Sequence, residues 1–177
     1  VMLSKKQKLF GIVICLYTGL RIGELLALTW DDVDFEKGEI NVSKSCYCRK
    51  GGIVVDSTKT EHSKRVIPLC KQLIKILRKT EKESNSEYVI SSNGKPVTTR
   101  SYQGSFESMQ KNLHIPHRGF HALRHTFATR ALECGMDVKT LSEIMGHKNS
   151  TITLNRYAHS LTEHKKAMIN KLGRNLE

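Results

Sequence analysis

The 177 residues are most simply one domain with a buried core, and their 38% hydrophobic and 26% charged content is ordinary for a soluble globular protein. Lysine and arginine number 29 against 17 aspartate and glutamate, so the net charge of +12 predicts an anionic partner, nucleic acid before an acidic membrane surface. No apolar run is long enough to span a membrane, and five scattered cysteines argue against a disulfide framework and favour the reducing cytoplasm.

The beginning of the chain has the apolar spacing of two helices. The first is predicted from Lys5 to Tyr17, with Ser4 as its cap and Gly19 as the residue that breaks it. The second, Ile22 to Leu28, begins directly after Arg21. This arginine would therefore lie at a helix N-terminus, where backbone N–H groups favour an anion.

The segment that follows alternates between apolar and polar residues, which is typical of strands. Gly51-Gly52 marks a turn, and a tight polar segment containing Lys59 would place that lysine at the tip of a second hairpin. The pattern predicts one small antiparallel sheet of three strands, Glu39–Ser45, Ile53–Ser57 and Lys64–Leu69. Cys46 and Cys48 could ligate a metal, but alternation along a strand explains them as well.

The rest of the chain is predicted to be helical, and Gly135 and Gly146 are expected to end two of its helices. The fold class is therefore α+β and mainly α, with helices around a small three-stranded antiparallel sheet. The predicted helices are Lys71–Lys82, one capped by Thr98 or Thr99 and ending near Leu113, His121–Cys134, Val138–Met145, Thr151–Ala158 and Glu163–Leu172.

The side chains needed for phosphodiester cleavage by a tyrosine are all present. A tyrosine hydroxyl has a pKa near 10, so it needs a neighbour that takes its proton, and the transition state needs fixed donors for its extra negative charge. Arginine suits that task because its planar fork binds two phosphate oxygens at once. Arg21 and Arg124 are the candidate clamps, and His121 lies three residues before Arg124 on the same helix face. His147 follows a glycine at a helix end, and Tyr157 lies ten residues further on.

Three sequence boxes occur in an order that resembles the tyrosine recombinases, the phage-integrase family. They are Thr-Gly-Leu-Arg-Ile-Gly-Glu-Leu at 18–25, His121-x-x-Arg124-His125, and Gly146-His147 with Tyr157 ten residues on. The strand element from Ser57-Thr58-Lys59-Thr60 to Leu69 also resembles the lysine hairpin of that family. Together these elements cover essentially the whole chain.

The resemblance implies a role for each matched residue. Tyr157 would be the nucleophile that forms a 3′-phosphotyrosyl bond with DNA, and Arg21, Arg124 and His147 would bind the scissile phosphate. His121 would take or relay the tyrosine proton, and Lys59 would protonate the leaving 5′ oxygen. Glu24 is expected to orient Arg21 or another basic group. No cofactor, metal or ATP would be needed, because the phosphotyrosine conserves the bond energy for rejoining.

The resemblance also implies the partners and the organisation of the chain. The chain would be a monomer when isolated and would form a homo-tetramer on double-stranded DNA. DNA-bending proteins could assist this assembly. Residues 1–177 would be the catalytic domain without the helical DNA-clamping domain that normally precedes it. The tail from 161 to 177 would form a helix that is exchanged between subunits. Further DNA contacts are expected from Thr60, Lys64, Arg65, Lys148 and Arg156.

The length of the insert Ser45–Asp56 favours integration or excision of a phage or mobile element. Two other functions compete with that interpretation. A non-catalytic DNA-binding protein could use Val138–His159 as a helix-turn-helix, but it would not need Arg21, Lys59 or Tyr157. A type IB topoisomerase shares the tyrosine chemistry and relaxes DNA without choosing a site. The Gly-Leu-Arg-x-Gly-Glu box and the small size favour a recombinase, of bacterial or phage origin and cytoplasmic.

Overall fold

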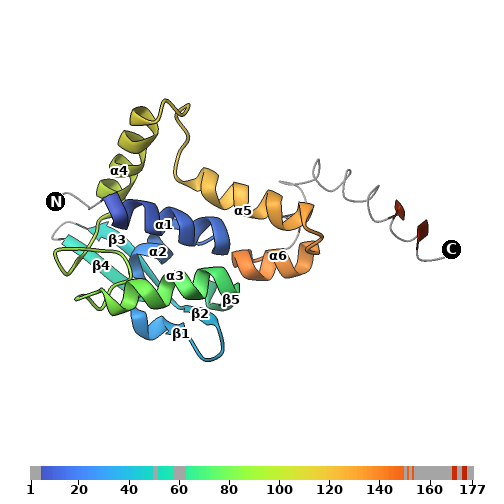
Figure 1. Ribbon diagram of the computed structural model, residues 1–177, viewed down its shortest axis with the longest axis horizontal. Coiled ribbons are helices and arrows are strands. Elements are labelled where there is room, and N and C mark those ends of the chain that lie inside the picture. The colour runs from blue at the N-terminus through green and yellow to red at the C-terminus, as the bar shows by residue number, and fades with distance from the viewer. Residues whose placement is uncertain are drawn as a thin grey trace.

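The computed structural model describes residues 5–49, 52–57, 63–149, 151, 153, 169–170 and 173–174. Helices form most of the described chain, and small antiparallel sheets lie to one side of them (Figure 1). The predicted bounds of α3 and α6 are confirmed, and those of the other four helices differ by one residue at most from the structure. The six helices are α1 (Lys5–Thr18), α2 (Ile22–Ala27), α3 (Lys71–Lys82), α4 (Thr99–Asn112), α5 (His121–Glu133) and α6 (Val138–Met145).

Two of these helices show why their termini could be predicted. The Thr98 hydroxyl accepts a hydrogen bond from the backbone N–H of Ser101 and so caps α4. The carboxylate of Asp137 does the same for α6 through the N–H of Thr140. At the other end of α6, Gly146 has φ 61° and ψ 46°, the left-handed conformation that glycine adopts at little cost.

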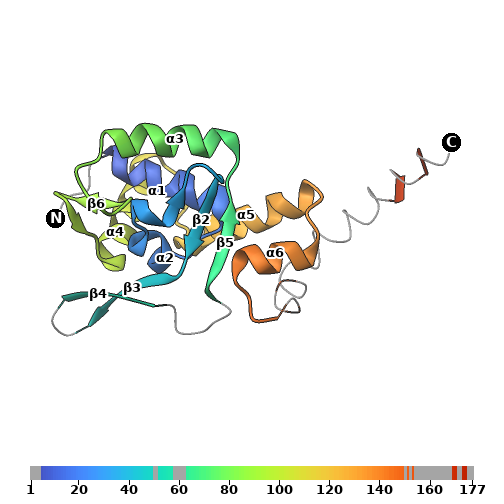
Figure 2. The same cartoon turned by 90° about the horizontal axis from the view of Figure 1, so that it is seen from below.

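Within the described residues, seven short strands form three separate antiparallel sheets. The first has the order β1-β2-β5, and Ile40 of β2 lies opposite Ile67 of β5. The second is the hairpin of β3 and β4, and it projects from the body of the molecule (Figure 2). The strands are β1 (Val33–Asp34), β2 (Glu39–Val42), β3 (Lys44–Arg49), β4 (Gly52–Ser57), β5 (Arg65–Pro68), β6 (Ser91–Ser92) and β7 (Lys95–Pro96), with a 3₁₀ turn, η1, at Trp30–Asp32 before β1.

A three-stranded antiparallel sheet is present, but one of its strands, β1, is not among those predicted, and the predicted strand 53–57 lies in another sheet. The expected strand Glu39–Ser45 divides at Ser43 between β2 and β3, and the expected partners 53–57 and 64–69 do not pair with each other. The strands before and after residues 58–62, β4 and β5, therefore belong to two different sheets, and the predicted hairpin tip at Lys59 lies outside the described residues. Alternation predicts strands from local sequence, whereas their partners depend on contacts between distant segments.

The hydrophobic core has a large part and a small part. The large part joins α1, α2, α3 and the first sheet, and it buries Ile14, Leu25, Ile40 and Leu73 completely. The small part lies between α5 and α6, around Leu132 and Leu141. Because α6 also packs against β5, the small part holds the end of α6 beside the first sheet (Figure 2).

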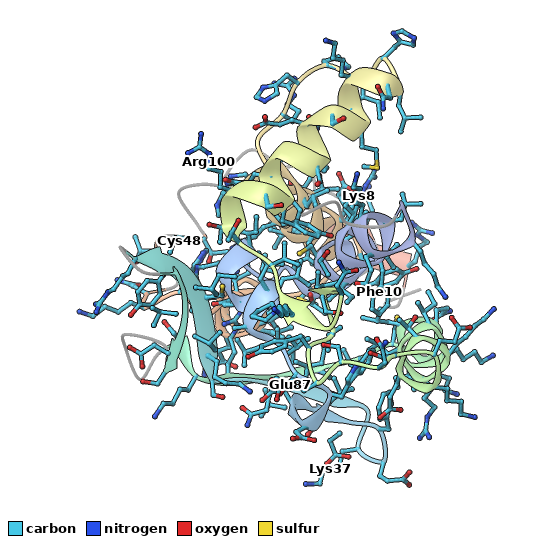
Figure 3. All side chains as sticks on the ribbon, turned by 90° about the vertical axis from the view of Figure 1, so that its left-hand side faces the viewer. Lys8, Phe10, Lys37, Cys48, Glu87 and Arg100 are labelled. Carbon is cyan, nitrogen blue, oxygen red and sulfur yellow. The ribbon has the colours of Figure 1, made fainter. Side chains whose placement is uncertain are left out.

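The cysteine pair on β3 has no arrangement that suggests a metal centre. Cys46 is buried, and its thiol lies 3.9 Å from the carbonyl oxygen of Val97. Cys48 is exposed at the edge of the molecule, whereas Phe10 lies in the packed interior (Figure 3). Across the described ranges, no group of three or more His, Cys, Asp or Glu residues is placed to hold a metal ion. None of the helices described there has both the length and the apolar character needed to cross a bilayer.

Candidate active site

Three arginines from three different elements converge on the C-terminal end of α6. Each donates a hydrogen bond to one of three consecutive backbone carbonyls, and we call these side chains the arginine cluster. The bonds are Arg65 Nε to Ile144 O at 2.5 Å, Arg124 Nη2 to Met145 O at 2.5 Å and Arg21 Nη2 to Gly146 O at 3.1 Å.

The end of a helix attracts cations because its last carbonyls have no partner within the helix and its dipole is negative there. The cluster satisfies these carbonyls with charged donors, which form stronger hydrogen bonds than neutral ones. It also connects the start of α2, the start of β5 and the first turn of α5 to α6. The sequence boxes that contain Arg21, Arg124 and His147 are thereby brought together.

Arg21 is positioned by the first turn of α2. Its backbone N–H donates to Glu24 Oε2 at 2.9 Å, and its Nη1 donates to Glu24 Oε1 at 2.8 Å. The third bond, to the Gly146 carbonyl, fixes the guanidinium in place. The side chain remains 38% exposed, so it can meet a ligand from solvent. This confirms that Glu24 orients Arg21.

The Glu24 carboxylate is buried and lies between two of the arginines. Arg65 binds it through two parallel hydrogen bonds, Nη1 to Oε1 at 3.0 Å and Nη2 to Oε2 at 2.9 Å. Burial by itself would raise the pKa of Glu24. The hydrogen bonds and charge of Arg65, together with the charge of Arg21, outweigh burial and hold that pKa below its usual value.

Arg124 is the most deeply buried member of the cluster, with 2% of the residue exposed. Its Nη1 donates to the carbonyl of Gly19 at 2.6 Å, while Nη2 reaches Met145. A guanidinium stays charged even when buried, and a charge acts more strongly in the low dielectric of an interior than in water. Arg21 and Arg65 pair with the carboxylate of Glu24, and Arg124 adds a third positive charge at the end of α6, a combination suited to an anionic ligand.

Two of the predicted site residues are histidines, one directly after Gly146 and one at the start of α5, the helix that carries Arg124. His147 follows Gly146, and its Nδ1 lies 2.7 Å from the hydroxyl of the buried Thr153. This contact holds the imidazole ring in one orientation. The tautomer of His147 decides whether its Nδ1 or the Thr153 hydroxyl donates the hydrogen bond. His121 is exposed at the first residue of α5, and its ring packs edge-to-face against that of His125 with centroids 4.8 Å apart.

The other predicted site residues have three different placements. Lys64 and Lys148 are exposed, as a DNA contact requires. Arg65 is not: only 6% of its side chain is accessible, so its position favours a role inside the protein over the predicted contact with DNA. Four predicted residues lie outside the part of the chain that the structure describes, namely Lys59, Thr60, Arg156 and Tyr157.

The inward position of Arg65 could have been read from the alternation of its strand. Side chains two residues apart in a strand point to the same face. Ile67 is buried, so Arg65 faces the interior with it, whereas Lys64 and Val66 face outward. The positive charge led us to predict a DNA contact where the alternation indicated burial.

Comparison with known proteins agrees with this arrangement. The model of the phage integrase family matches residues 2–164. The chain belongs to that family. Its phage integrase relatives include a XerC-like tyrosine recombinase of Caldanaerobacter subterraneus, which is 32% identical over 173 residues. That alignment covers 84% of this chain and 44% of the relative. The transposase of transposon Tn916 from Enterococcus faecalis is 30% identical over 181 residues, covering 92% of this chain and 45% of the transposase.

A solved structure of the same phage integrase family has a similar fold. The Tn1549 transposon integrase in complex with transposon right end DNA superposes with a TM-score of 0.81 at 34% identity. The match covers 95% of this chain and 59% of that integrase. The chain thus spans less than half the length of the two relatives named above.

Proposed function

We propose that the chain is the catalytic part of a site-specific DNA recombinase that cuts and rejoins strands through a phosphotyrosine on Tyr157. One observation carries the proposal: Arg21 and Arg124 are held on the adjacent carbonyls of Met145 and Gly146, directly before His147. These donors come from the three boxes of the family, and together they can grip one phosphate. The family membership supports the same chemistry.

In this mechanism the tyrosine oxygen attacks the scissile phosphorus, and the bond from phosphorus to the 5′ oxygen breaks. Arg21, Arg124 and His147 stabilise the charge that develops on the non-bridging oxygens. His121 takes or relays the proton of the tyrosine, and Lys59 gives a proton to the departing 5′ oxygen. Rejoining is the reverse reaction, in which a 5′ hydroxyl attacks the phosphotyrosine and releases the tyrosine. The residues of the chain thus supply each proton and charge, with no cofactor.

The substrate of this reaction is double-stranded DNA, in keeping with the net charge of +12. Exposed Lys64 and Lys148 are suited to phosphate contacts, as are Thr60 and Arg156 by residue type. Relatives that act in transposons favour integration or excision of a mobile element. A homo-tetramer would form on DNA, with the tail from 161 to 177 exchanged between subunits, and DNA-bending proteins would assist it.

A suicide substrate tests the proposal. The substrate is a duplex with a nick beside a candidate crossover site, so that cleavage releases a short fragment and traps the enzyme on DNA. We expect a covalent protein–DNA adduct on a denaturing gel with the native chain and none with Tyr157→Phe. Tyr17→Phe is the matched control, because Tyr17 lies exposed on α1, and it should form the adduct normally.

Two results would contradict the proposal. An adduct that persists in Tyr157→Phe would assign the covalent bond to another residue. Retarded DNA without any adduct, at every crossover sequence tested, would favour the non-catalytic helix-turn-helix protein instead.

A further inference from the structure

We propose that Arg65 is a positioning residue for strand cleavage: it sets the geometry of the phosphate clamp without touching DNA. This inference rests on the proposed function and names a residue outside the catalytic set. Arg65 binds Glu24 through two parallel hydrogen bonds and also contacts the end of α6. Arg21 contacts the same two groups from the solvent side.

The first part of the argument concerns Arg21. The Glu24 carboxylate that holds Arg21 Nη1 is itself held by Arg65 through two parallel bonds. A carboxylate fixed from one side by a planar fork presents its remaining lone pairs in one direction. Arg65 thus determines where Glu24 holds Arg21, and it acts on the phosphate through these two side chains and not through its own guanidinium.

The second part concerns His147. Arg65 Nε donates to the carbonyl of Ile144, three residues before His147. The backbone N–H of His147 donates to the Ser142 carbonyl at 3.0 Å, so the histidine is attached to the same last turn of α6. Moving that turn relative to β5 would move His147 relative to Arg21. Arg65 therefore fixes the distance between two groups that must meet one phosphate.

The third part concerns what Arg65 leaves accessible. Only 6% of its side chain is exposed, and its hydrogen bonds to Glu24, Ile144 and Ser63 use its donors within the protein. Lys64, the preceding residue, is exposed. Arg65 also begins β5, six residues after Lys59 in the sequence, so it anchors the end of the segment that contains the proposed general acid.

The experiment separates DNA affinity from the cleavage rate in Arg65→Met, Arg65→Lys and Lys64→Met. Binding to a duplex is measured as a function of salt, and the rate of adduct formation is measured on the suicide substrate at saturating protein. We expect Arg65→Met to keep its DNA affinity and salt slope but to cleave about 100-fold more slowly, because small displacements of reacting groups have effects of that size. Arg65→Lys should recover part of the rate, since one charged bond to Glu24 can re-form.

Lys64→Met is the matched control for a phosphate contact at the neighbouring position. If Lys64 touches DNA, its loss should lower the slope of log affinity against log salt by about 0.9. The same behaviour in Arg65→Met would overturn the inference, as would wild-type cleavage by that variant. If Arg65→Met does not show a native melting transition, DNA affinity and cleavage rate are measured on Arg65→Lys instead. An unchanged cleavage rate in that variant would also overturn the inference. The proposed function fails separately, when the native chain itself forms no adduct.

Discussion

Replacing Gly146 by alanine should destabilise the protein at the junction between α6 and the arginine cluster. The backbone there has φ 61°, and an L-residue with a Cβ atom in that conformation costs about 1–2 kcal/mol. The added Cβ would also lie 3.0 Å from Arg65 Nη1 and 3.1 Å from its Cδ. Because Arg65 is held by Glu24 and Ile144, it cannot move away without weakening those bonds.

These two effects together predict a loss of about 2 kcal/mol in the free energy of unfolding. For a chain of this length each kcal/mol lowers the melting temperature by about 2–4 °C, so the variant should melt roughly 4–8 °C below the wild type. Differential scanning calorimetry or thermal circular dichroism measures the shift. Adduct formation on the suicide substrate should also slow, because His147 follows the altered residue.

Gly104→Ala is the matched control. Gly104 lies inside α4, and a Cβ there would have open space around it. Alanine should therefore stabilise this helix by about 0.5–1 kcal/mol, which is the ordinary effect of removing a helical glycine. The reasoning about Gly146 is refuted if Gly146→Ala melts at or above the wild-type temperature while Gly104→Ala behaves as expected.

Three further predictions concern other buried or capped positions. Glu24→Gln should lower the free energy of unfolding at pH 7 by about 3 kcal/mol, because the buried Arg65 would then lack a negatively charged partner. Since the folded pKa of Glu24 is lowered, its contribution is present above the usual value of 4.5 and lost as pH falls further, so urea titrations should show the two proteins converging in acid. Gly11→Ala should destabilise α1 although it removes a helical glycine, because the new Cβ would overlap the hydroxyl of Tyr102, and a lowered melting temperature checks this. Thr98→Ala should cost about 1 kcal/mol through loss of the α4 cap, and an unchanged urea midpoint would contradict that.

The helices of this protein could be predicted from the sequence because they depend on local features. The apolar period of 3.6 residues and the residues at their ends identified α3 and α6 with their observed bounds. Gly146 was predicted to end α6, and its left-handed backbone conformation explains why glycine stands there. Arg21 was expected at a helix N-terminus, where α2 begins directly after it.

Tertiary structure alone decided which strands pair. Alternation is the same whichever partner a strand has, so it could not show that β5 pairs with β2 and that β4 pairs with β3. The pairing depends on apolar contacts between segments far apart in the chain, such as Ile40 with Ile67. The predicted pairing of 53–57 with 64–69 was wrong for that reason.

The arginine cluster also required the tertiary structure. The sequence by itself determined that Arg21 and Arg124 carry charges suited to a phosphate, since residue type and motif order are local properties. It did not determine that Arg65 meets Glu24, or that three guanidinium groups share the last carbonyls of α6. Those contacts join residues 21 to 125 positions apart, and only the packing of α2, α5, α6 and β5 brings their atoms within hydrogen-bonding distance.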